Sequence, residues 1–185
     1  MVKINILDIG CGLKKYDSGN ENDTIFGLDK YFSDNADLLA ELESSNLPFK
    51  SNIFDKVIAS HILEHIENLH KIMSEIHRIS KNNGILYIWT PHASDLSAFG
   101  HIGHVRYFTV NSFLHFTYEN AENQFIKEKF RLKKIKLYFV RKFSKFSFLN
   151  IIFYPLLNIN HKFYEKFLCR LIPAGEMYVE LEVIK

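Results

Sequence analysis

The sequence LDIGCG occupies residues 7–12 and places an acid and two glycines at the end of an apolar, β-branched run. Residues 4–9 therefore predict a buried strand that ends in a tight turn, where glycine lets the backbone approach a ligand closely. Residues 25–28 predict a second short strand, and Asp29 follows it, about 20 residues after the turn, where a carboxylate can accept both hydroxyls of a ribose. The turn and Asp29 thus indicate a nucleoside site. The alternative is a purely structural turn, with Asp29 as a helix cap.

Strand and helix patterns alternate through the first half of the chain. Short apolar runs predict further strands at residues 36–42, 54–60, 85–89, 130–140 and 177–184. Apolar residues recur at helical spacing over residues 62–79, and the lysine and glycine of Lys81–Gly84 predict the helix end, with glycine as a left-handed cap. Strands that alternate with crossovers form a parallel sheet flanked by helices, with the ligand crevice at the carboxyl ends of the strands.

Three segments depart from this alternation. Residues 13–23 are polar and predict that the first crossover helix is short or absent. Residues 110–118 predict a helix, and residues 143–171 predict an aromatic, partly basic helical cap, broken at Pro155, inserted between the last two strands. We therefore expect an α/β fold with a Rossmann-like, mostly parallel seven-stranded sheet in one domain over residues 1–185.

The composition is that of an ordinary globular protein. Of 185 residues, 47% are hydrophobic and 24% charged, with a net charge of +2, which excludes collagen-like, disordered and low-complexity classes. The two cysteines, Cys11 and Cys169, form no CxxC pair and argue against a disulfide scaffold, so we expect a reducing cytoplasm. The N-terminus lacks signal-peptide features, and the longest apolar run, residues 148–157, is shorter than the roughly 20 residues of a membrane span.

Five segments together carry a family resemblance: LDIGCG at 7–12, FGLD at 26–29, LPF at 47–49, FDKVIASHILEHI at 54–66 and IHRISKNNGILYIWTPH at 76–92. With these motifs the chain resembles the class I S-adenosylmethionine-dependent methyltransferases, in particular their small single-domain group. The resemblance implies S-adenosylmethionine as cofactor, S-adenosylhomocysteine as product and an antiparallel last strand. We therefore expect methyl transfer to an oxygen or nitrogen of a small or medium acceptor. The basic strand beside the aromatic cap adds a lipid or lipid-linked sugar as a further candidate acceptor.

The same resemblance implies the cofactor-binding residues. Gly10, Cys11 and Gly12 would wrap the methionine part of the cofactor, with Asp8 near its amino group. Asp29 would hold the ribose, and Lys30 would lie beside it. The adenine would meet Glu41 and Leu42, and the floor of the site would be lined by Ser60 and His61. The third glycine of the usual motif is absent, and Lys14 stands in its place. This departure keeps open an alternative, a non-catalytic methyltransferase-like module that binds a partner through its apolar cap.

Histidines are the candidate bases, because in-line methyl transfer needs an aligned nucleophile and, where required, removal of its proton. The candidate catalytic residues are His61, His104 and Arg106, and the candidate acceptor-binding residues are His92, His101, His104, Arg106 and Tyr107. A three-histidine metal site of His92, His101 and His104 and a loop bonded to its own backbone are alternatives. The reaction itself requires no metal, and His65 has no predicted role beyond structure.

A basic stripe and the cap bear on partners. Residues 127–145 hold nine Lys or Arg and one Glu, a pattern that attracts phosphates, although the alternation of Lys129, Arg131 and Lys133 with apolar residues favours a solvated edge strand. Nucleic acid is therefore disfavoured. The apolar cap predicts a lid over the site, a peripheral membrane contact beside the basic strand, or a partner surface.

Overall fold

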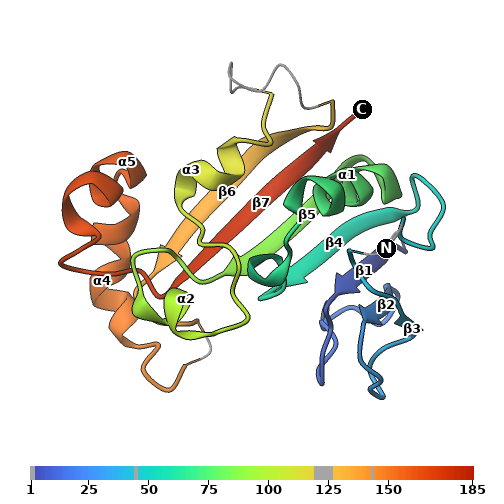
Figure 1. The fold of residues 1–185 in the computed structure, drawn as a ribbon, viewed down its shortest axis with the longest axis horizontal. Helices are drawn as coiled ribbons and strands as arrows, with labels where there is room; N and C mark the ends of the chain where they lie inside the picture. The colour runs from blue at the N-terminus through green and yellow to red at the C-terminus, as the bar shows by residue number, and fades with distance from the viewer. Residues whose placement is uncertain (1–2, 44–45, 119–126, 143) are drawn as a thin grey trace.

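The computed structural model describes residues 3–43, 46–118, 127–142 and 144–185 (Figure 1). Seven strands form one sheet in the order β3-β2-β1-β4-β5-β7-β6. The strands are β1 (Asn5–Ile9), β2 (Thr24–Asp29), β3 (Leu38–Leu39), β4 (Phe54–Ser60), β5 (Ser80–Thr90), β6 (Lys129–Tyr138) and β7 (Glu176–Ile184). The first five pair in parallel, and β7 runs antiparallel to both β5 and β6. This confirms the predicted sheet and its antiparallel last strand.

The helices follow β4 in the chain. They are η1 (Leu63–His65), α1 (Leu69–Ile79), α2 (Leu96–Gly100), α3 (Val110–Leu114), α4 (Leu149–Asn158), α5 (His161–Phe163) and the π-helix η2 (Tyr164–Leu168). The apolar side of α1 carries Leu69, Ile72, Met73, Ile76 and Ile79, which are buried in the core beside β4 and β5. Burial of this stripe stabilises α1, because each fully buried apolar side chain contributes about 1.5–3 kcal/mol.

The connection from β1 to β2 contains no helix, as its polar sequence predicts. Side chains in this segment bond to the backbone two residues on: Asp17 accepts from the Gly19 amide at 2.8 Å, and Ser18 accepts from the Asn20 amide at 3.2 Å. Such local turns compete with helix formation. Residues 10–23 are therefore a loop that lies along the edge where the parallel strands end.

The helix predicted over residues 62–79 begins later than its periodicity indicates. His61 has a positive φ of 52°, which no right-handed helix accommodates, and only the short turn η1 follows it. Helix α1 starts after Asn68, whose side chain accepts a bond from the Lys71 amide at 3.1 Å. The helix ends at Ile79, so the predicted cap at Gly84 was wrong. The left-handed residue there is Asn83, inside β5.

Other boundaries also differ. The strand predicted at residues 36–42 is only the two residues of β3, and the helix predicted at 110–118 ends at Leu114. Helix α4 continues through Pro155, contrary to the prediction of a break there. Pro155 cannot donate to the carbonyl of Ile151, four residues earlier, and both residues are exposed. Phe143, the predicted first residue of the cap, lies outside the described residues.

The cap is anchored to β6 by two asparagines of α4. Asn158 exchanges hydrogen bonds with both the amide and the carbonyl of Leu137, at 2.9 and 2.8 Å, and Asn150 does the same with Val140. The basic residues of β6 pair with acids of β7: Arg131 lies 2.9 Å from Glu182 and Lys134 lies 3.8 Å from Glu180. These pairs reduce the positive potential of the edge strand.

Candidate functional site

A cleft of about 860 Å³ opens at the carboxyl ends of β1, β4 and β5. The volume suits a cofactor-sized ligand. Its lining includes the predicted residues Asp8, Gly10, Cys11, Ser60 and His61, together with Lys14, Lys15, Tyr16, Asp17, Ile58, Trp89, Arg141, Ser144 and Glu176. The crevice is thus at the edge of the sheet that the strand pattern predicts.

The glycine turn brings the backbone to the cleft. Gly10 and Gly12 have positive φ angles of 69° and 55°, and the Gly10 amide donates to the Leu28 carbonyl at 2.7 Å. A Cβ on Gly10 would lie 2.7 Å from a side-chain carbon of Ile62, whereas a Cβ on Gly12 would meet nothing within 4 Å. Gly10 is therefore required by the packing under the turn, and Gly12 faces open space.

Asp29 lies beside this turn at the end of β2. Its Oδ2 accepts from the Gly12 amide at 2.8 Å, and its Oδ1 accepts from the Tyr31 amide at 2.9 Å. Each carboxylate oxygen has a second lone pair, so both remain able to accept a ligand hydroxyl. Lys30 is exposed, Glu41 is exposed just after β3, and Leu42 is buried in the core. Asp29, Lys30, Glu41 and Leu42 are not part of the cleft lining.

Asp8 is a buried acid in the cleft wall. Burial raises the pKa of its carboxyl to about 6, although the amide of Tyr16, which donates to its Oδ2 at 2.7 Å, and the charge of Lys15 act in the opposite direction. Asp8 fixes the loop after the glycine turn through this bond. Its charge is therefore sensitive to a ligand that carries a cation into the cleft.

His61 stands between two buried carboxylates. Its Nε2 lies 3.0 Å from Oε1 of Glu176, and its Nδ1 lies 3.3 Å from Oε1 of Glu64. Burial by itself lowers the pKa of His61, but the hydrogen bond to Glu176 and the negative charge of Glu64 outweigh it and raise the pKa to about 9. His61 is therefore a cation at neutral pH, and in that state both ring nitrogens are donors and neither can take up a proton.

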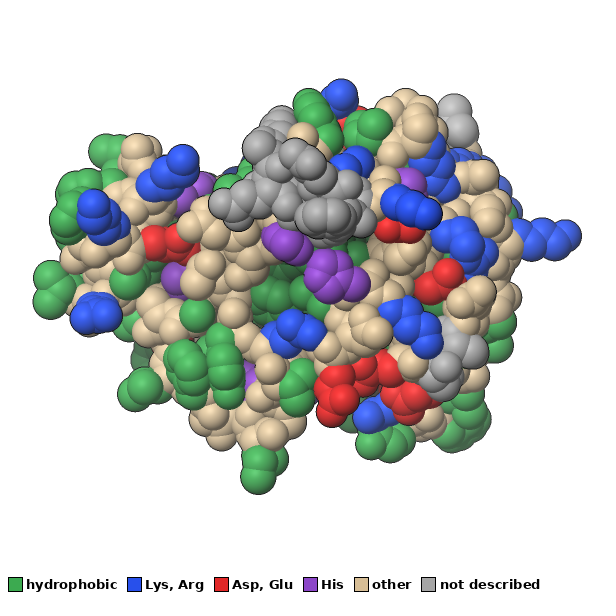
Figure 2. All heavy atoms as spheres, turned by 45° about the horizontal axis from the view of Figure 1, so that its top comes forward, with side chains coloured by type: hydrophobic (Ala, Val, Ile, Leu, Met, Phe, Trp, Pro, Cys, Tyr) green, Lys and Arg blue, Asp and Glu red, His purple; other side chains and the backbone are tan. Residues whose placement is uncertain are grey.

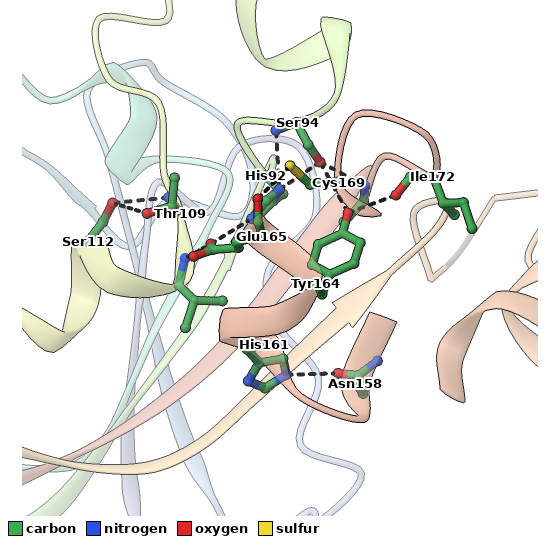
Figure 3. A network of polar contacts seen from close by, with 12 residues as sticks. His92, Ser94, Thr109, Ser112, Asn158, His161, Tyr164, Glu165, Cys169 and Ile172 are labelled. Atoms are coloured by element: carbon green, nitrogen blue, oxygen red, sulfur yellow. Dashed lines mark hydrogen bonds and ion pairs between the residues drawn. The ribbon is translucent and has the colours of Figure 1, made fainter. Parts of the chain in front are cut away.

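His92 is tied to the cap, and it does not reach the cleft. Its Nδ1 lies 2.8 Å from Oγ of Ser94, and its Nε2 lies 3.2 Å from Oε1 of Glu165 in η2, as Figure 3 shows. Glu165 also accepts from the Val110 amide at 2.6 Å, and Tyr164 donates to the Ile172 carbonyl at 2.9 Å. This network joins the loop after β5, the start of α3 and the cap.

The other predicted acceptor residues are also outside the cleft lining. Nδ1 of His104 donates to the Ala98 carbonyl at 2.7 Å, and the Arg106 guanidinium donates to the carbonyls of Ile66 and Glu67. Tyr107 is half-exposed and stacks on Phe99, with ring centroids 4.2 Å apart. His101 is exposed at the end of α2. These side chains are therefore separate from the cleft that Asp8, Gly10 and His61 line.

Sequence reasoning missed several residues of the cleft. Lys14, Tyr16 and Asp17 lie in the loop after the glycine turn, and Trp89 follows the alternation of β5. Arg141 and Glu176 flank the cap. A signal for Glu176 exists in the sequence, because it begins a strand whose neighbour in the sheet is β5 and so starts at the carboxyl edge.

The first half of the chain is similar in sequence to known proteins. Residues 7–88 match a family model described as a methyltransferase domain. Uncharacterized protein MJ0638 of Methanocaldococcus jannaschii is 34% identical over 93 residues, which cover 45% of this chain and 39% of that protein. The chain thus spans about two fifths of the length of this curated relative.

Solved structures match almost the whole chain. A SAM-dependent methyltransferase from Archaeoglobus fulgidus has a TM-score of 0.60 at 15% identity, over 97% of this chain and 86% of that one. The YcgJ protein of Bacillus subtilis has a TM-score of 0.59 at 16% identity, over 99% and 92%. The [4+2]-cyclase SpnF has a TM-score of 0.59 at 16% identity, over 98% and 74%. At these identities the similarity establishes the fold alone.

Proposed function

Residues 7–88 belong to the class I S-adenosylmethionine-dependent methyltransferase family, and from this premise we propose that the chain transfers a methyl group to a small or medium acceptor. The observation that carries the proposal is the cleft itself, because the glycine turn, Asp8 and the ends of β4 and β5 border one volume of about 860 Å³. Residues 1–185 act as one domain in this proposal, because β6 and β7 complete the sheet that begins with β1.

The residues present suit the cofactor of this family. The open space above Gly12 admits a ligand against the backbone, and Asp29 offers lone pairs beside it for ribose hydroxyls. Asp8 and Asp17 carry the negative charge that suits an amino group, and Lys14 and Arg141 carry the positive charge that suits a carboxylate. Gly10, Cys11, Ser60 and His61 would line the remainder, while Lys30, Glu41 and Leu42 would lie at its adenine end.

Methyl transfer requires little proton transfer by the side chains of this protein. S-adenosylmethionine supplies a methyl group on a positively charged sulfur, ready for in-line displacement. The protein then contributes alignment and exclusion of water, and His61, as a cation between Glu64 and Glu176, fixes these two carboxylates beside the cleft. In this proposal His61 is no general base, and His104 and Arg106 position the loop after β5 instead of contacting the acceptor. The acceptor atom is an oxygen or nitrogen.

Calorimetric titration with S-adenosylmethionine and S-adenosylhomocysteine tests the proposal. We expect binding in the micromolar range, and a loss of at least about 100-fold in Asp29→Ala, because hydrogen bonds to a charged group contribute about 1.5–3 kcal/mol each. Asp34→Ala is the matched control, since Asp34 is an exposed acid in the loop after β2 to which the proposal assigns no ligand contact. No binding by the folded wild-type protein at millimolar ligand contradicts the proposal and favours the partner-binding module.

The cap favours a second proposal, that the protein works as a peripheral enzyme on an anionic membrane and methylates a lipid or lipid-linked acceptor. Nine large apolar side chains of the cap are exposed: Phe146, Phe148, Ile151, Ile152, Leu156, Ile159, Phe163, Phe167 and Leu171. Four exposed cations lie among them, Lys145, Lys162, Lys166 and Arg170. Figure 2 shows hydrophobic and Lys or Arg side chains together at this end of the molecule. In the described residues no helix is long and apolar enough to cross a membrane.

Co-sedimentation with vesicles tests this second proposal. Binding to phosphatidylcholine vesicles that contain phosphatidylserine, weakening as salt rises, is the expected result, because basic residues near the surface contribute about 1 kcal/mol each. Ile151→Asp with Ile152→Asp is expected to abolish it. Leu13→Asp is the matched control, since Leu13 is 89% exposed but lies far from the cap in sequence, in the loop after β1. Equal binding by all three proteins, or none, contradicts the membrane proposal.

A further inference from the structure

Three histidines outside the cleft form a compact cluster. His65 ends the turn η1, His101 follows α2, and His104 lies in the next loop. One ring nitrogen from each lies within 4.8 Å of the others. The ring centroids are 4.8 Å apart for His65 and His104, 5.2 Å for His65 and His101, and 4.7 Å for His101 and His104. The fold thus brings imidazoles from two separate segments into one group.

Backbone carbonyls set the tautomer of two of these rings. Nδ1 of His65 lies 2.8 Å from the Gly103 carbonyl, and Nδ1 of His104 lies 2.7 Å from the Ala98 carbonyl. A carbonyl oxygen only accepts, so each Nδ1 carries the proton and each Nε2 keeps a free lone pair. An Nδ1–H bonded to a carbonyl is the arrangement that orients histidines which bind a metal through Nε2.

The third ring, that of His101, is the one that can move. Nδ1 of His101 accepts from the Gly103 amide at 3.2 Å, a long bond, and the side chain is exposed. Ligand nitrogens of a tetrahedral zinc ion are about 3.3 Å apart, given Zn–N bonds of about 2.0–2.1 Å, so a separation of 4.8 Å must close. His101 can make this movement by exchanging its bond to Gly103 for the metal.

The absence of a side chain at Gly103 leaves space for the rings of the cluster. A Cβ at this position would lie 3.2 Å from Cε1 of His101 and 3.3 Å from Nδ1 of His65. The bonds within the described residues place no carboxylate on any of the three rings, so the group offers three imidazole nitrogens and no oxygen ligand. Imidazole nitrogens of this kind suit Zn²⁺ and its neighbours Co²⁺, Ni²⁺ and Cu²⁺, and do not suit Mg²⁺ or Ca²⁺.

We propose that His65, His101 and His104 bind one Zn²⁺ ion, with water in the fourth position, and that this ion fastens the loop after α2 to the segment after β4. The two segments already meet there, because the Glu64 carbonyl accepts from the amides of Val105 and Arg106 at 2.9 and 3.1 Å. The ion would hold this contact beside Glu64, whose carboxylate faces His61 in the cleft. The site is independent of methyl transfer.

Metal titration of the untagged full chain tests the proposal. After treatment with a chelator and its removal, we expect one Zn²⁺ per chain with a dissociation constant at or below the micromolar range, measured by competition with a chromogenic chelator. Co²⁺ should give the visible absorption of a tetrahedral site. Both His101→Ala and His104→Ala are expected to weaken binding at least about 100-fold, since loss of even an outer-shell partner costs 10–100-fold.

A control variant and a measurement of melting temperature complete the test. His101 is exposed, so His101→Ala tests the ligand without a change in the core, and His115→Ala, an exposed histidine outside the cluster, should bind Zn²⁺ as the wild type does. Zn²⁺ should also raise the melting temperature of the wild type and of His115→Ala and leave that of His101→Ala unchanged. No stoichiometric Zn²⁺ in the wild type, or equal binding by His101→Ala and His104→Ala, overturns the proposal.

Discussion

The turn after β1 and the loop after β5 both carry residues of catalytic or ligand-binding types. The residues of the turn line the cleft, whereas those of the loop hold the structure together. Around the turn, Asp8, Gly10 and Cys11 reach the cleft, because each lies at or just past the end of a strand whose register is fixed. In the loop, His92 and Arg106 bond to the cap and to backbone carbonyls instead. The difference teaches that a polar residue at a strand end is positioned for a ligand. A polar residue in a long loop instead forms the hydrogen bonds that hold the loop in place.

Loss of His61 gives the largest expected effect, and it tests whether this strand-end residue is structural as well as functional. In His61→Gln the carboxylates of Glu64 and Glu176, which are 1% and 4% exposed, lose their cation. Removal of one partner of a buried pair costs about 3–5 kcal/mol, so we expect a drop of about that size in the free energy of unfolding. Urea denaturation measures it, with His70→Gln, an exposed histidine, as control.

A general base at His61 predicts a different result. The variant would then keep its stability and lose only turnover, with a rate that rises through a pKa near the ordinary value of His, about 6.5. Stability within about 0.5 kcal/mol of the wild type would therefore refute the ion-pair role and restore His61 as a candidate base.

The pH dependence of stability sharpens the same point. The folded-state pKa of His61 is raised from 6.5 to about 9, so its stabilising contribution is complete below pH 6.5 and is lost as pH rises through 9. We expect the free energy of unfolding to fall by up to about 3 kcal/mol across this window, since one pKa unit corresponds to about 1.4 kcal/mol. Denaturation at a series of pH values measures the slope. His61→Gln should flatten it, and an unchanged slope in the variant would assign the effect to other groups.

The two glycines of the turn offer an effect of middle size. Gly10→Ala places a Cβ 2.7 Å from Ile62 at a positive φ, so we expect about 2–3 kcal/mol of destabilisation. Gly12→Ala has the same backbone strain but open space, so about 1 kcal/mol is expected. Its cofactor affinity should nevertheless fall, because the new methyl group would enter the space that the ligand needs. Thermal unfolding and calorimetry separate the two effects, and equal stability losses would show that Ile62 yields.

The residues that sequence reasoning placed correctly share a physical reason. The five parallel strands and the crevice at their carboxyl ends follow from apolar runs and from a rule that holds for every parallel sheet. The family resemblance then implies Asp8 and Ser60 as residues of that crevice, and both line the cleft. The positive φ of His61 occurs where its ring meets Glu176, 115 residues further along the chain, so no local pattern signals it. The partner of His92 is equally nonlocal, because Glu165 is 73 residues away in the chain. His104 bonds to the Ala98 carbonyl six residues away, in the same segment after β5.

Substitutions of Arg106 and Arg141 should have smaller effects than those of His61 and Gly10, and they compare the two regions directly. Arg106→Gln removes guanidinium bonds to the carbonyls of Ile66 and Glu67. We expect the free energy of unfolding to fall by about 1–2 kcal/mol while the dissociation constant for S-adenosylmethionine changes less than about 2-fold. Arg141→Gln is the matched variant, since Arg141 is exposed and lines the cleft. It should leave stability unchanged and weaken cofactor binding by about 10-fold, because a charged partner is lost.

The opposite pattern would reverse the comparison. If Arg106 contacts the acceptor, its variant keeps the wild-type stability and raises the KM for the acceptor, because the guanidinium would then be free to bind a carboxylate or phosphate. Arg106→Lys distinguishes a planar donor from a simple charge: a lysine cannot donate to Ile66 and Glu67 in the same fork, so only the loop-fastening role predicts that it is as destabilising as Arg106→Gln. Stability restored by lysine would show that Arg106 acts by its charge, and the loop after β5 would then belong to the acceptor site.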